Sequence, residues 1–142
     1  MISIMTDAPL ILIIDDESDF REIFSTKLGA SGFRVETAES AAVGLKKAKQ
    51  LKPALVLMDV MMPVMDGAAA VLKLRDDPET RGIKVAFLTS LGDPRAEMRA
   101  NDQKFAEDFG AMQYLKKTDD LDLLAGKVRA LIGAGTSSRA QP

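Results

Sequence analysis

Residues 55–67, LVLMDVMMPVMDG, place a short apolar run directly before an aspartate, Asp59, and a methionine-rich turn directly after it. Such a run predicts a strand that is buried on both faces and ends at the carboxylate. Residues 10–17, LILIIDDE, repeat the arrangement nearer the N-terminus, because an apolar run again leads into acids. Two strands of this kind are typical of a parallel sheet with helices on both faces.

The rest of the chain alternates between strand and helix patterns. Together with the two runs above, apolar residues predict strands at 10–14, 33–38, 54–59, 83–90 and 111–117. Apolar residues at helical spacing predict helices at about 19–30, 41–51, 67–75, 94–109 and 121–132. This alternation predicts an α/β fold with a doubly wound, five-stranded parallel sheet of flavodoxin-like order 2-1-3-4-5. Ligands of such sheets bind at the carboxyl ends of the first and third strands.

Composition excludes several classes of function. The 142 residues suit one domain, and the net charge of −2 gives no electrostatic footprint for direct nucleic-acid binding. The chain has no cysteine and no histidine, so thiol chemistry, a histidine base and histidine metal ligands are excluded. Any metal site must use oxygen ligands, which favours Mg²⁺, Ca²⁺ or Mn²⁺. No basic segment precedes the first apolar run, so we expect no signal peptide, no membrane contact and a cytoplasmic location.

Polar side chains follow the predicted strands at their carboxyl ends. They are Asp15, Asp16 and Glu17 after the first strand, Asp59 after the third, Thr89 and Ser90 after the fourth, and Lys116 and Lys117 after the fifth. In the predicted order the first and third strands are neighbours, about 4.8 Å apart, so their carboxylates converge. Carboxylates this close repel one another unless a cation neutralises them. An aspartate nucleophile, a metal, a lysine and a hydroxyl together suit the transfer of a phosphoryl group to a carboxylate.

Each of these residues also has a structural explanation. The aspartates could cap a loop or a strand end, and a lone threonine or lysine at a strand end is common. Asp66, before Gly67, is better explained as a turn and helix cap than as a ligand. The methionines of the 55–67 segment are better explained as core or partner surface. A chemical site is favoured because every polar feature falls at a carboxyl end and none at an amino end.

Four segments carry a family resemblance. LILIIDDE, LVLMDVMMPVMDG, AFLTS (86–90) and YLKK (114–117), in this order and spacing, closely resemble the receiver domain of two-component response regulators. The resemblance covers about residues 9–133, which leaves 1–8 as an N-terminal extension. The small, polar tail 134–142 is predicted to be disordered.

The resemblance also implies roles for single residues. Asp59 corresponds to the phosphoacceptor. Asp15, Asp16, Asp59 and the backbone carbonyl of Met61 correspond to the ligands of Mg²⁺, with Mn²⁺ as an alternative ion. Thr89 and Tyr114 correspond to the switch hydroxyl and the switch aromatic, and Lys117, rather than Lys116, to the phosphate-binding lysine.

Two apolar residues should control access of water to the phosphoryl group. Met61 and Leu91 lie two positions after Asp59 and Thr89, where side chains are expected to overhang the line of attack. Neither side chain can orient water through a hydrogen bond, and both can exclude it. We therefore expect slow self-dephosphorylation.

The implied function is that of a stand-alone receiver, not an enzyme beyond its own phosphorylation and dephosphorylation. A histidine kinase or a histidine phosphotransfer protein should supply the phosphoryl group. The face formed by the fourth helix, fifth strand and fifth helix should then bind a downstream protein, with the chain a monomer or a weak, phosphorylation-dependent dimer.

Two alternatives remain open. A Mg²⁺-dependent phosphatase or phosphotransferase with an aspartyl intermediate, of the haloacid dehalogenase kind, would need a second acid where this chain has Met61. A phosphorylation-independent interaction module would not need the complete acidic set.

Overall fold

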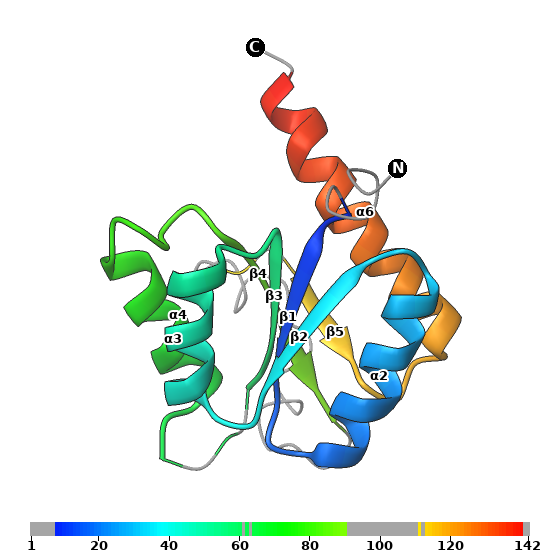
Figure 1. Ribbon diagram of the computed structural model, residues 1–142, viewed down its shortest axis with the longest axis horizontal. Helices are drawn as coiled ribbons and strands as arrows, with labels where there is room; N and C mark the ends of the chain where they lie inside the picture. Colours follow the sequence, from blue (N-terminus) through cyan, green and yellow to red (C-terminus); the bar gives the residue numbers. More distant parts are fainter. Residues whose placement is uncertain (1–7, 61, 63, 91–110, 112, 141–142) are drawn as a thin grey trace.

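Five parallel strands form the centre of the molecule. The computed structural model describes residues 8–60, 62, 64–90, 111 and 113–140. The strands are β1 (Leu10–Ile14), β2 (Arg34–Ala38), β3 (Leu55–Asp59), β4 (Lys84–Thr89) and β5 (Gln113–Lys116), and they lie in the order β2-β1-β3-β4-β5 (Figure 1). The predicted fold class and strand order are therefore confirmed.

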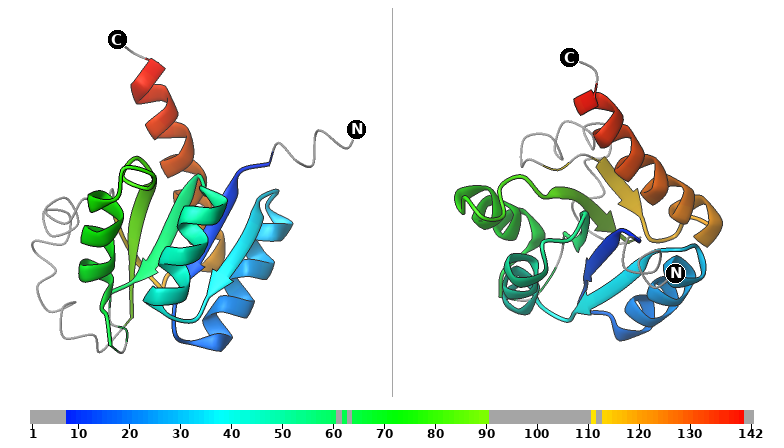
Figure 2. Two further views of the ribbon diagram at one scale, coloured as in Figure 1. Left: turned by 60° about the vertical axis from the view of Figure 1, so that its left-hand side comes forward. Right: turned by 45° about the horizontal axis from the view of Figure 1, so that its top comes forward.

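Helices cover both faces of the sheet. The described helices are α2 (Ser18–Ala30), α3 (Ala41–Leu51), α4 (Gly67–Asp76) and α6 (Leu121–Ala140). α3 and α4 lie on one face, and α2 and α6 lie on the other (Figures 1 and 2). The helix predicted at 94–109 lies outside the described residues. Of the helices that are described, none is long and apolar enough to cross a membrane.

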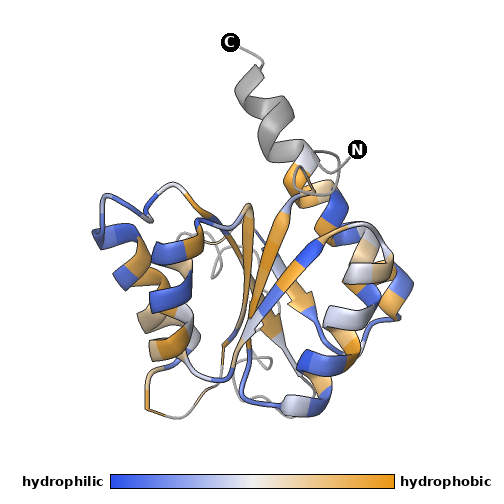
Figure 3. Cartoon of the chain, viewed as in Figure 1, coloured by the Kyte–Doolittle hydropathy of each residue, from blue (hydrophilic) through white to orange (hydrophobic). Residues whose placement is uncertain are grey.

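The core has two layers because successive side chains of a strand point to opposite faces of the sheet. Leu12 and Ile14 of β1 face α3 and α4, whereas Ile11 and Ile13 face α2 and α6. All five residues of β3 are buried, as expected for a central strand of a parallel sheet. The central strands β1 and β3 are accordingly almost continuously apolar (Figure 3).

Side-chain caps fix where two of the helices begin. Ser40 accepts a hydrogen bond from the backbone N–H of Val43 at the start of α3. Asp66 accepts one from the backbone N–H of Ala69, at 2.9 Å, at the start of α4. Asp66 therefore has the capping role that the sequence indicated, and α4 begins directly after the turn that follows Asp59.

The last helix runs to the C-terminal end of the described residues. α6 continues to Ala140, and the disorder predicted for 134–142 stays a prediction. The buried residues Leu124, Val128 and Leu131 anchor the first part of the helix against the sheet. Once a helix is nucleated, each added residue gains one hydrogen bond at little cost, so the helix extends beyond its packed turns. The domain limits predicted at residues 9 and 133 remain a prediction.

Two helical glycines have opposite surroundings. A Cβ at Gly67 would lie 2.5 Å from the carbonyl oxygen of Asp59, because the start of α4 packs directly on the end of β3. The N–H of Gly67 also donates to the carbonyl of Val60 at 2.8 Å. Gly126, in contrast, is exposed in α6 and has no neighbouring atom within 4 Å of such a Cβ.

The same substitution at these two glycines should therefore have opposite effects. We expect Gly67→Ala to lower the free energy of unfolding by about 1–3 kcal/mol, because backbone rather than a flexible side chain must move. Gly126→Ala should raise it by up to about 1 kcal/mol through helix propensity. Urea unfolding followed by circular dichroism measures both. Stabilisation by both substitutions would contradict the close packing of α4 on β3.

Candidate functional site

Three aspartates meet at the carboxyl edge of the sheet. Ile14 of β1 pairs with Met58 of β3, so Asp15 and Asp59 follow at the same level. One carboxylate oxygen from each of Asp15, Asp16 and Asp59 lies within 4.8 Å of the others. Asp15 and Asp59 are buried, whereas Asp16 is exposed. The cluster is therefore closed on the core side and open at Asp16, which is the geometry of a crevice that a small ligand can enter.

Backbone hydrogen bonds continue the sheet beyond its strands and fix this edge. The N–H of Asp15 donates to the carbonyl of Ala38 at 3.0 Å, and the N–H of Lys117 donates to the carbonyl of Thr89 at 2.7 Å. The N–H of Glu17 donates to Oδ1 of Asp15 at 2.8 Å, which closes the turn after β1. The side chains of the site are thus carried by rigid backbone.

The Lys117 side chain reaches the aspartate cluster from β5. Its Nζ lies 2.6 Å from Oδ2 of Asp15, 2.6 Å from Oε1 of Glu17 and 3.4 Å from Oδ2 of Asp59. The lysine side chain is 6% exposed. Lys116, its neighbour, is exposed, because alternate residues of a strand face opposite ways. The choice of Lys117 over Lys116 therefore agrees with the geometry.

Burial and ion pairing act together on two pKa values. Burial raises the pKa of the Asp15 carboxyl above its usual range, and the ion pair with Lys117 opposes this shift. For Lys117, burial is the largest single influence and lowers the pKa. The contacts with Asp15 and Glu17 and the nearby charge of Asp59 together outweigh burial, so the pKa of Lys117 lies above its ordinary value. Lys117 is accordingly a fixed positive charge at neutral pH.

The remaining predicted residues are distributed around this centre. Thr89 is 1% exposed and ends β4, next to the strand that carries Asp59. Tyr114 lies on β5, and its ring packs against that of Phe87 with centroids 6.1 Å apart. Met61 and Leu91 lie outside the described residues, so the carbonyl ligand and the water-excluding roles assigned to them stay predictions.

Sequence reasoning missed two residues that contact Lys117. Glu17 follows the first predicted strand without an assigned role, and Phe20 lies in the helix predicted at about 19–30. The Nζ of Lys117 lies 4.9 Å from the centroid of the Phe20 ring, in addition to its ion pair with Glu17. The position of Glu17 beside the acid pair was a usable signal, whereas nothing in the sequence links Phe20 to Lys117.

Comparison with protein families identifies the family of this chain. Residues 11–129 match the family described as the response regulator receiver domain. The chain belongs to this family. Receiver domains belong to two-component signalling systems, in which phosphorylation on aspartate and binding of Mg²⁺ at an acidic pocket are typical.

Two curated relatives show how the receiver is used elsewhere. The DNA-binding dual master transcriptional regulator RpaA of Synechocystis is 36% identical over 124 residues, which are 87% of this chain and 49% of that protein. The response regulator PleD of Caulobacter vibrioides is 37% identical over 121 residues, which are 85% of this chain and 25% of that protein. The chain therefore spans half or less of the length of these relatives.

Solved structures share the receiver architecture. The receiver domain of a signal transduction histidine kinase from Syntrophus aciditrophicus is 30% identical, with a TM-score of 0.75, and the match covers 89% of this chain and 92% of that one. The chemotaxis protein CheY4 of Vibrio cholerae is 25% identical, with a TM-score of 0.73, over 86% of this chain and 97% of that one.

The donor set of this receiver fits a hard divalent cation. All three acidic side chains offer oxygen, and Asp16 opens the cluster to solvent, where an ion can retain water ligands. Mg²⁺ binds in this way, through a few carboxylates together with waters and phosphate oxygens. The negative charge of three carboxylates exceeds what the single ammonium of Lys117 neutralises, so a cation would lower their mutual repulsion.

Removal of the lysine should expose how much the buried Asp15 depends on it. We expect Lys117→Met, without divalent ions, to lower the free energy of unfolding by about 3 kcal/mol, because a buried carboxylate loses its partner. Asp15→Asn in the same background should restore much of the loss. Lys127→Met removes a more exposed pair with Asp119, 3.3 Å apart, and should cost about 1 kcal/mol or less. Urea unfolding measures all three; equal losses for both lysines would be inconsistent with the buried pair.

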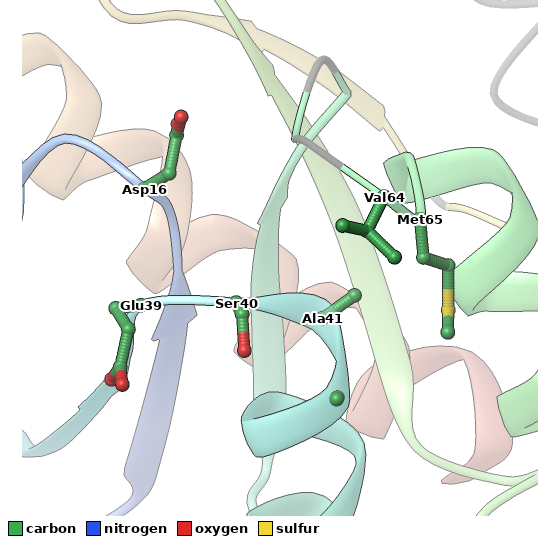
Figure 4. A pocket seen from close by; sticks show the side chains of 7 residues that line it. Asp16, Glu39, Ser40, Ala41, Val64 and Met65 are labelled. Carbon is green, nitrogen blue, oxygen red and sulfur yellow. The ribbon is translucent and has the colours of Figure 1, made fainter.

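An apolar groove adjoins the aspartate cluster. Its lining comes from three segments: Asp16, residues 39–42 at the start of α3, and Val64 and Met65 before α4. Figure 4 shows Val64 and Met65 near Ala41 and Ser40 on one side of Asp16. Val64 is fully exposed and has φ of 72°, in the left-handed region that β-branched residues rarely adopt. The chain therefore carries backbone strain at the rim of the site.

Substitution of Val64 should relieve that strain selectively. We expect Val64→Asn to raise the free energy of unfolding by about 1 kcal/mol, because asparagine tolerates the left-handed conformation. Val64→Thr has the same shape and the same branching, so it should leave the stability unchanged to within about 0.5 kcal/mol. If both variants stabilise the protein equally in urea unfolding, loss of the exposed apolar side chain, rather than the backbone, is the cause.

Proposed function

We propose that this receiver is phosphorylated on Asp59 by a histidine kinase or a histidine phosphotransfer protein, and that the phosphorylated form binds a downstream protein. The position of Asp59 is the observation that supports this function most strongly. Its carboxylate lies within 4.8 Å of those of Asp15 and Asp16 and 3.4 Å from the ammonium of Lys117. A nucleophile is thus surrounded by the groups that can receive a cation and neutralise a phosphoryl group.

The transfer itself is a displacement at phosphorus. An oxygen of Asp59 forms the new P–O bond as the P–N bond of the phosphohistidine breaks, and the electron pair of that bond stays on the imidazole nitrogen. Lys117 donates a hydrogen bond to a phosphoryl oxygen and balances its charge. The ligands of the metal would be Asp15, Asp16, Asp59 and the carbonyl of Met61, and bound Mg²⁺, or Mn²⁺, would neutralise the remaining charge on those oxygens. The protein mainly positions the groups, since phosphoryl transfer requires little other chemistry from it.

The signal would leave the site through Thr89 and Tyr114. The Thr89 hydroxyl is on the strand next to Asp59 and is suited to hydrogen-bond a phosphoryl oxygen. Tyr114 packs against Phe87 of the same strand, so a shift at the end of β4 changes the packing of the tyrosine ring. The face that carries β5 would then differ between the two states, as in other switches that start from a local change of charge.

Incubation with acetyl phosphate and Mg²⁺, followed by intact-mass measurement, tests the acceptor. Wild type should gain one phosphoryl group, and Asp59→Asn should gain none while it keeps its fold. Asp66→Asn is the matched control, because it removes a nearby carboxylate that caps α4 and should still be phosphorylated. Asp16→Ala should weaken Mg²⁺ binding, measured by calorimetry, through loss of a charged ligand. Phosphorylation of Asp59→Asn would place the acceptor elsewhere.

The lifetime of the phosphorylated state tests the roles of Met61 and Leu91. After removal of the donor, we expect slow decay of the wild type, because no polar group at these positions orients the attacking water. Met61→Asn and Leu91→Glu should each speed the decay, since orienting a nucleophile lowers the barrier. Wild-type decay within seconds, or no acceleration in either variant, would refute water exclusion.

A further inference from the structure

Lys117 has neighbours on α2 as well as on the sheet. Glu17, which precedes the first residue of α2, forms the 2.6 Å ion pair with its ammonium, and the ring of Phe20 lies 4.9 Å from it. The Phe20 ring rests against that of Phe24, with centroids 5.3 Å apart, and Phe24 is fully buried. The first turn of α2 therefore holds a charged group and a ring, both in defined positions, beside the lysine.

The Glu17 side chain does not serve the helix that it begins. Glu17 is the N-cap residue of α2, but its side chain makes no capping hydrogen bond, which is the usual function of a polar side chain there. Its backbone is fixed, since the N–H donates to Asp15 and the carbonyl accepts from Arg21 at 3.1 Å. The carboxylate is directed to Lys117 instead.

We propose that Glu17 and Phe20 form a holding site for Lys117 and that Lys117 leaves Glu17 for the phosphoryl group when Asp59 is phosphorylated. The inference rests on the proposed function, because it assigns a positioning residue to that reaction. Glu17 then sets how readily Lys117 becomes available to the phosphoryl oxygens.

Crowding of acceptors around the lysine favours such an exchange. Lys117 donates hydrogen bonds to Glu17 and Asp59 and forms an ion pair with Asp15, so its three N–H groups already face three carboxylates. The contact with Asp59 is the longest of the three, at 3.4 Å compared with 2.6 Å for the others. Phosphorylation turns the Asp59 carboxylate, with one negative charge, into an acyl phosphate with about two, and its phosphoryl oxygens are strong acceptors that compete with the existing partners of Lys117.

Exposure decides which contact opens. The Asp15 side chain is 0% exposed, and a carboxylate left there without a partner is strongly unfavourable. The Glu17 side chain is 59% exposed, so water can replace the lysine at little cost. The Phe20 ring attracts the ammonium by a cation–π interaction on the α2 side, and this interaction does not use an N–H donor. Glu17 is therefore the releasable contact.

The test uses beryllofluoride, a phosphoryl analogue, with the full chain and saturating Mg²⁺. Without the Glu17 carboxylate, beryllofluoride has one competitor fewer for the ammonium of Lys117. Glu17→Gln should therefore bind beryllofluoride about two- to five-fold more tightly than wild type, which is the range for loss of an exposed ion pair. Phe20→Leu keeps apolar volume and should shift the affinity in the same direction by a smaller factor.

Glu22→Gln is the matched control, because it removes the same charge from an exposed position on the same helix. Its beryllofluoride affinity should equal that of wild type. If Glu17→Gln behaves as Glu22→Gln does, Glu17 is a surface acid without this role. If Glu17→Gln binds the analogue more weakly, Glu17 places Lys117 productively, and the holding site is overturned.

A second measurement separates the holding site from the proposed function. In lysine-¹³C-labelled protein without ligand, the Cε signal of Lys117 is assigned by its absence from Lys117→Arg. It should move in Glu17→Gln and not in Glu22→Gln. If wild type binds no beryllofluoride, the proposed function fails. The Cε signal of Lys117 then tests the Glu17–Lys117 contact by itself. An unmoved signal in Glu17→Gln overturns the inference.

Discussion

The ammonium of Lys117 between the carboxylates of Asp15 and Asp59 is the interaction on which the site depends. A parallel sheet brings the ends of β1 and β3 together, and this places two nearly inaccessible acids side by side. Such a pair is unfavourable unless positive charge lies against it. Lys117 supplies that charge from β5, and the bond from its N–H to the carbonyl of Thr89 fixes its backbone. Stability and chemistry therefore use the same ion pair.

Close packing at the loops keeps the acids in place. α4 starts so near β3 that Gly67 has no room for a Cβ, and Asp66 caps the helix at that point. Gly44 has a similar position in α3, where a Cβ would lie 2.3 Å from Cδ1 of Ile14. Both helices of this face thus approach the sheet close to the residues that precede the site. Precise placement of a carboxylate requires such rigid support.

The two sides of the aspartate cluster differ in character. On the α2 side, Lys117 is enclosed by Glu17 and Phe20, so charge and aromatic surface meet. On the α3 side, a groove with Val64 and Met65 is mainly apolar and ends at Asp16. A partner that brought a phosphoryl group to Asp59, as proposed, would meet both surfaces. The differences between receivers in such flanking residues, rather than in the aspartates, are where partner preference can reside.

The sequence by itself determined the sheet, its order and the identity of the polar residues at its carboxyl edge. It could do so because buried parallel strands are continuous apolar runs and because crossover connections leave few topologies. It also assigned Asp66 to a cap, whereas the choice of Lys117 over Lys116 came from the resemblance to receiver domains. Tertiary structure alone decided that Glu17 serves Lys117 rather than α2, that Phe20 lies against the ammonium and that Val64 is strained. The physical reason is that strand periodicity is a local property, whereas the contacts of Glu17 and Phe20 with Lys117 join residues about a hundred positions apart in the sequence.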